Sequence, residues 1–87
     1  MAQTVAEVLT AATDSVTVIT DINTNGSSSE YVPSDFTQAE INEIVQRNVD
    51  HLELILEYTE PNVKGSSDDK SSYTGAITTG NAYIAAN

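Results

Sequence analysis

The residue type that most often serves as a general acid or base in enzymes occurs once in this sequence, as His51. A catalytic histidine needs a nucleophile and a group that orients its ring, and the sequence nominates neither. A zinc site would need further histidine or cysteine ligands, and the chain has no cysteine. Pairs of carboxylates are uninformative, because thirteen aspartates and glutamates place such pairs together by chance. We therefore expect no catalytic residue, no cofactor and no enzymatic activity.

A second group of residues matches the first half of a calcium-binding loop. Residues 21–26 read D-x-N-x-N-G, where the glycine would permit the sharp turn of such a loop. The side-chain oxygens of Asp21, Asn23 and Asn25 would occupy its first three ligand positions. The twelfth position, where a bidentate glutamate belongs, is Val32. An Asn-Gly turn in a polar loop explains the same residues without a metal, and we favour the turn over a calcium site.

The composition excludes several classes of protein. Three lysines and arginines stand against thirteen acids, and the formal net charge is −10. A surface of this sign repels a phosphate backbone, so we expect no direct nucleic-acid binding, and we expect cations or basic protein surfaces as partners. No apolar run reaches the length of a membrane span, and the N-terminal segment lacks the basic residues of a signal peptide. A chain of 87 residues makes one domain with a small core, which oligomerisation or docking on a larger assembly often supports.

The element that organises the chain is a central helix, expected over residues 37–59. Thr37 and Glu40 form a T-x-x-E capping box, in which each side chain accepts a hydrogen bond from the backbone amide of the other residue. A hydrophobic residue on each side of this cap forms a staple. The helix should end near residue 59, because Pro61 disfavours helical geometry in the residue before it.

One face of this helix is apolar and the opposite face is acidic. The apolar positions are Ile41, Ile44, Val45, Leu52, Ile55 and Leu56, with Val49 at the edge. Asn48 interrupts them, and it either bonds to the local backbone or sets the register of a helix–helix contact; we favour the local bond. The C-terminal half of the opposite face carries Asp50, Glu53, Glu57 and Glu60. These acids oppose the helix dipole, and they form either a solvated face or a patch for a basic partner.

The first helix is expected over residues 4–20. Its β-branched end, residues 15–20, also fits a short strand, but the apolar row continues in register, so we favour a helix. Residues 21–35 follow as a linker rich in Asn, Ser and Gly, which we expect to be flexible because connections of this length are usually functional or disordered.

The third helix is expected over residues 67–86, although its glycines and threonines disfavour helix formation. Such a helix survives only by packing against neighbours. Ala76 and Gly80 lie on its apolar face and would let another backbone approach closely. That backbone belongs either to this chain or to another subunit.

Together these patterns predict an all-α fold, a small three-helix bundle with a long first connection, in one domain over residues 1–87. The residues that we expect to serve protein–protein interaction are Tyr31, Val32, Leu54, Tyr58, Ala76, Gly80 and Tyr83. They lie off the apolar stripes, in the linker, or at the small-residue seam of the third helix.

Three stretches carry a resemblance to a known group of proteins: the start MAQTV, the central VQRNVDHLELILEY and the small-residue tail SSYTGAITTGNAYIAAN. In overall style the chain resembles the short, acidic structural proteins of tailed bacteriophages, the marine and cyanophage kind especially. The resemblance implies a many-copy virion component of head, neck or tail, assembled in the host cytoplasm, that docks on larger virion subunits or on copies of itself. It transfers no functional residues. The alternatives are an acidic inhibitor, such as a DNA mimic that occupies basic sites on nucleic-acid enzymes, and a calcium-dependent module.

Overall fold

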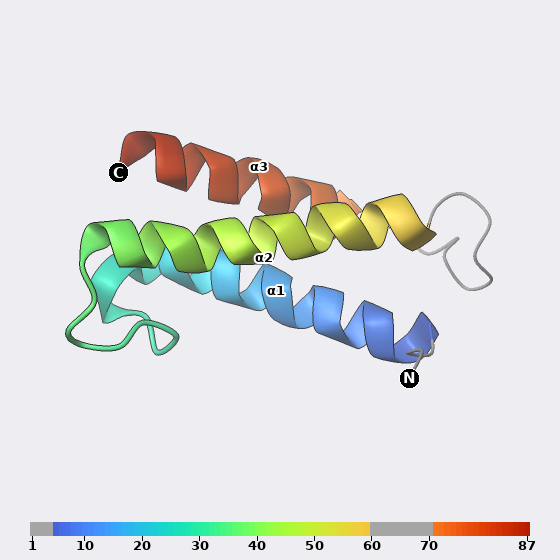
Figure 1. Cartoon of the computed structure of the whole chain (residues 1–87), viewed down its shortest axis with the longest axis horizontal. Coiled ribbons are helices and arrows are strands. Elements are labelled where there is room, and N and C mark those ends of the chain that lie inside the picture. The colour runs from blue at the N-terminus through green and yellow to red at the C-terminus, as the bar shows by residue number, and fades with distance from the viewer. Residues whose placement is uncertain (1–4, 60–70) are drawn as a thin grey trace.

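The chain folds into three helices that pack against one another, as seen in a computed structural model that describes residues 5–59 and 71–87 (Figure 1). The helices are α1 (Val5–Asn25), α2 (Gln38–Thr59) and α3 (Ser71–Ala86), and a short 3-10 turn, η1 (Gly26–Ser28), follows α1. Each helix contacts both of the others, and the described residues include no strand. The predicted all-α three-helix bundle is therefore confirmed. The expected start of the third helix, before residue 71, lies outside the described residues.

Helix α1 is longer than the sequence pattern predicted. Its β-branched segment is helical, and the helix continues through residues 21–25, which we had assigned to the linker. Ile22 explains the difference, because its side chain is fully buried and extends the apolar row by one more turn beyond Ile19. This burial outweighs the poor helix propensity of the Asp, Asn and Thr residues around it. The helix ends at Asn25, directly before Gly26, whose φ of 56° is the left-handed conformation that glycine adopts at helix C-termini.

The hydrophobic core lies between the three helices. Its buried members are Ala12, Ile19, Ile22, Val32, Ile41, Val45, Val49, Leu52, Ile55 and Ala76. Val49, which we had placed at the edge of the apolar face, is fully buried, whereas Ile44 and Leu56 are only half-buried. The reason is that α2 packs against two helices at once, so the centre of its buried stripe lies between the two contacts.

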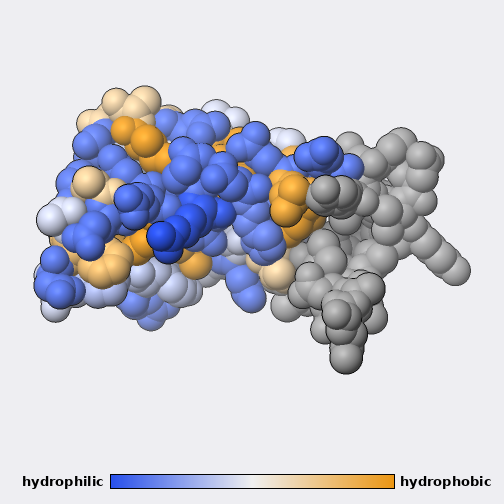
Figure 2. Space-filling view, viewed as in Figure 1, coloured by the Kyte–Doolittle hydropathy of each residue, from blue (hydrophilic) through white to orange (hydrophobic). Residues whose placement is uncertain are grey.

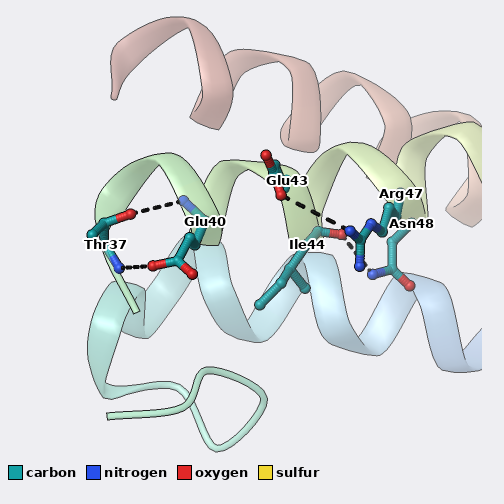
Figure 3. Close-up of polar contacts among 6 residues, drawn as sticks. All are labelled: Thr37, Glu40, Glu43, Ile44, Arg47 and Asn48. Atoms are coloured by element: carbon teal, nitrogen blue, oxygen red, sulfur yellow. Dashed lines mark hydrogen bonds and ion pairs between the residues drawn. The ribbon is translucent and has the colours of Figure 1, made fainter. Parts of the chain in front are cut away.

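The N-terminus of α2 has the capping box that the sequence predicted (Figure 3). The backbone amide of Thr37 donates to Glu40 Oε1 at 2.8 Å, and the amide of Glu40 donates to Thr37 Oγ1 at 3.2 Å. Phe36 and Ile41 on either side of the cap both belong to the core cluster, as a hydrophobic staple requires. The start of α2 is therefore determined by local interactions.

Replacing Thr37 by alanine is expected to lower the free energy of unfolding by about 1 kcal/mol, because the backbone amide of Glu40 in the first turn loses its acceptor, Thr37 Oγ1. Urea denaturation followed by circular dichroism measures this loss. Thr78→Ala is the matched control, since that exposed hydroxyl only donates to the Thr74 carbonyl within α3 and alanine is the better helix former. Equal losses in the two variants would contradict a special role for the cap.

Candidate interaction surface

The residues of the half calcium loop lie in a helix, so the predicted loop geometry does not form. Asp21, Asn23 and Asn25 belong to the last turns of α1. At 3.6 residues per turn, Asn23 points about 200° away from Asp21 around the helix axis, and the three side chains do not converge. One carboxylate oxygen of Asp21 instead accepts a hydrogen bond from Asn25 Nδ2 at 2.9 Å. Among the described residues, no group of three or more His, Cys, Asp and Glu side chains is placed to hold a metal ion.

Asp21 has a different role, in holding the connection after α1 against the bundle. Its second carboxylate oxygen accepts a hydrogen bond from the hydroxyl of Ser29, a buried residue. The same hydroxyl oxygen accepts from the backbone amide of Tyr31, and the Ser29 carbonyl accepts from the amide of Val32. Val32 is thereby placed in the core, and the part of the predicted flexible linker around it is anchored. Of the two residues we expected to contact partners here, Val32 packs inside this chain.

Tyr31 remains at the surface, with 37% of its area exposed. The neighbouring Glu30 carboxylate raises the pKa of Tyr31, chiefly by accepting a hydrogen bond from the phenol, and desolvation and the negative charges of Glu30, Asp21 and Asp14 add to this increase. The exposed ring of Tyr31 is available for contact with a partner.

The small residues of α3 pack within this chain and do not form an outward seam. Ala76 and Gly80 are both buried. A Cβ added at Gly80 would lie 2.5 Å from Val49 Cγ2 and 3.2 Å from Val45 Cγ1, so α2 approaches the α3 backbone directly. This corrects the prediction that Ala76 and Gly80 contact another subunit. Their contact is the close packing within the bundle, which was the alternative that the sequence left open.

Two tyrosines among the predicted interaction residues have different outcomes. Tyr83 is half-buried against the core, and its hydroxyl accepts a hydrogen bond from Gln38 Nε2 at 3.0 Å. The hydroxyl of Tyr83 therefore ties α3 to the start of α2. The side chain of Tyr58 lies outside the described residues.

Leu54 is the large hydrophobic residue with the greatest exposure in the described part of the chain, at 48%. It lies on the outer face of α2, within a row at helical spacing that consists of Glu43, Arg47, Asp50, Leu54 and Glu57. We call this row, together with Glu53, the outer face of α2; all its members are exposed. Figure 2 shows the molecule from the same side as Figure 1, in which α2 lies in front. Hydrophilic residues dominate the surface on this side, and hydrophobic residues form separate patches.

The charges of this face are unevenly distributed along the helix. Arg47 in the N-terminal half lies 3.9 Å from Glu43, a loose and exposed ion pair worth well under about 1 kcal/mol (Figure 3). Asp50 accepts a hydrogen bond from Gln46 Nε2 at 2.8 Å, which leaves its negative charge in place. Glu53 and Glu57 are a like-charge pair one turn apart, and they oppose the helix dipole at a cost of about 0.2–1 kcal/mol. The C-terminal half is therefore acidic around one exposed leucine.

Asn48 on the opposite side of α2 makes the local contact that we favoured (Figure 3). Its Nδ2 donates to the Ile44 carbonyl at 2.8 Å, and the side chain is half-buried. The register of the bundle is thus not set by a hydrogen bond from this residue to another helix.

A polar contact between helices occurs at a pair that the sequence reasoning missed. Ser15 Oγ on α1 lies 2.8 Å from Nδ1 of His51 on α2. The Ser15 side chain is buried, with 4% exposed, so its hydroxyl is closed to a substrate and the pair joins two helices. The available signal was the position of Ser15, three residues after Ala12 and four before Ile19 in the buried row of α1.

Over residues 5–59 and 71–87, no helix combines the length and the hydropathy needed to cross a bilayer. No protein-family model matches the sequence, and neither the curated proteins nor the solved structures include a significant match.

Proposed function

We propose that this chain is a non-enzymatic structural protein, a many-copy component of a tailed-phage particle that docks on larger subunits at the head, neck or tail. The observation that carries the proposal is the division of the surface into chemically different faces. The outer face of α2 is acidic around Leu54, whereas α3 has no ionisable side chain other than tyrosine between residues 71 and 87. A small body with one charged and one uncharged face suits a position between unlike neighbours in an assembly.

The packing of the bundle supports the same role. The described apolar rows of all three helices close on each other, and the small residues of α3 are used for that closure. Features that could distinguish one partner from another therefore lie on the outer surface. A rigid module that loses little conformational entropy on docking is favoured as an assembly component.

Quantitative mass spectrometry of purified particles, from the phage that encodes this chain, tests the proposal. We expect the chain to co-purify with the particles at many copies each, at a constant ratio to the major subunits through successive gradients. A chain that is made during infection but stays in the soluble fraction would overturn it. Light scattering of the pure protein over a concentration series then separates self-assembly, which gives a discrete oligomer, from docking on a foreign subunit, which leaves a monomer.

The acids of α2 also favour a second candidate, an inhibitor that occupies the basic site of a nucleic-acid enzyme. Asp50, Glu53 and Glu57 lie on one exposed side of the helix, as a mimic of a phosphate row requires. This role predicts inhibition of a DNA-binding enzyme that DNA relieves competitively and that salt weakens. Inhibition that is absent or insensitive to salt would exclude it.

A further inference from the structure

We infer that the outer face of α2 is a docking surface for a basic helix of a protein partner, with Leu54 as the apolar contact at its centre. The inference rests on the proposed structural role, for which it names the binding face and the kind of partner. Its starting point is Leu54, a side chain that is 48% exposed while the other described leucine, isoleucine and valine residues of α2 are buried or half-buried.

The geometry of the face indicates a helical partner. Its row of residues advances by four, three, four and three positions, from Glu43 through Leu54 to Glu57. This spacing keeps the row in line along the helix, on the side opposite to the buried row that contains Val45 and Leu52. A second helix can therefore lie along it and contact successive members.

The charges around Leu54 determine the sign of the partner. Asp50, Glu53 and Glu57 surround it within one turn on either side, and the nearest basic residue of the helix, Arg47, already faces Glu43. Lysine or arginine residues that flank an apolar position on the partner would match all three acids. A second copy that docks through its own outer face does not fit, because the acids around one Leu54 would lie against those around the other. Nucleic acid does not fit either, for the same reason of sign.

Binding of the full chain to a synthetic amphipathic helix of leucine and lysine tests the inference, with fluorescence anisotropy as the readout. We expect Leu54→Gln to weaken the binding about tenfold, because the complex no longer removes from water the half of the leucine side chain that the free protein exposes. Leu54→Ala should weaken the binding to a similar extent. Glutamine and alanine both favour helix, so neither change disturbs the fold. Unchanged affinity in both variants would show that Leu54 has no docking role and would overturn the inference.

A matched pair of charge reversals tests the position of the acids. Glu53→Lys with Glu57→Lys changes the net charge by the same amount as Glu30→Lys with Asp35→Lys, and all four residues are exposed. The first pair should reduce the affinity at least about tenfold more than the second, since only the first lies on the docking face. Equal losses of affinity in the two double variants would mean that binding depends only on the net charge of the protein, and the outer face of α2 would not be a docking site.

Backbone amide NMR spectra with the same peptide locate the contact directly. We expect shifts confined to the outer face of α2, and shifts centred on α3 would overturn the inference. These outcomes are separate from those of the particle experiment. If the chain is present in particles but its affinity for the peptide does not depend on Leu54, the structural role stands and the docking face is rejected. If the chain binds the peptide through Leu54 but is absent from particles, the docking face stands and the phage role is rejected.

Discussion

Gly80→Leu is expected to lower the free energy of unfolding by about 3 kcal/mol or more, a large part of the roughly 5–15 kcal/mol that stabilises a domain of ordinary size. The reason is the contact between α3 and α2. Even the first added carbon would lie 2.5 Å from Val49 Cγ2, far inside the separation of about 3.5–4.0 Å at which carbon atoms attract. Val49 is β-branched and fully buried, so it has little freedom to move away.

The other glycine of α3 provides the control. Nothing lies within 4 Å of a Cβ built at Gly75, and the position is exposed. Gly75→Ala should therefore raise the free energy of unfolding by about 0.5–1 kcal/mol, because alanine has the better helix propensity. Urea denaturation of both variants, with light scattering on the same samples, checks the pair. A Gly80→Leu protein that keeps its monomer stability but loses an oligomer would show that Gly80 contacts another subunit after all.

Ile22→Ala is expected to cost about 2–5 kcal/mol, the range found when a buried isoleucine is truncated and leaves a cavity. Ile22 is fully buried in the last turns of α1, where it extends the row that includes Ile19. In a domain of this size the loss corresponds to a fall of at least about 8 °C in the midpoint of thermal unfolding.

The neighbouring Thr20→Ala is the matched control for this change. Its side chain is exposed and donates a hydrogen bond only to the Val16 carbonyl within the same helix, so we expect a change within about 0.5 kcal/mol. A loss in Ile22→Ala no larger than that in Thr20→Ala would mean that residues 21–25 form a mobile linker and are not part of the packed helix. Thermal unfolding followed by circular dichroism decides between the two.

Local patterns of the sequence were sufficient for the helices whose ends depend on neighbouring residues. The capping box of Thr37 and Glu40 places the start of α2, because its two hydrogen bonds join residues only three apart. The all-α class followed equally from apolar rows at helical spacing. The predicted end of α1 was wrong because it depends on residues that are distant in the sequence. Asp, Asn and Thr are poor helix formers, and only the burial of Ile22 by the other elements keeps that turn helical.

The candidate interaction residues show the same division. Leu54 was identified as exposed from its place on the acidic face of α2, and it is exposed. Val32, Ala76 and Gly80 were assigned to partner contacts, but all three lie inside the bundle. For the two residues of α3 the assignment was wrong because sequence spacing cannot tell whether a small residue faces a helix of its own chain or of another subunit. Tyr83 depends on Gln38, 45 residues away, and the pairing of the two has no local signature.

The sequence by itself determined three things about this protein: a helical class, an acidic surface concentrated on the central helix, and one exposed leucine within it. Each depends on residue type and on a helical period that repeats within a few positions. The tertiary structure decided the length of α1, the anchoring of the connection through Asp21 and Ser29, the contact of Ser15 with His51 and the inward use of Gly80. Each of these depends on where one element lies against another, and the close approach of two backbones is set by the packing of all three helices at once.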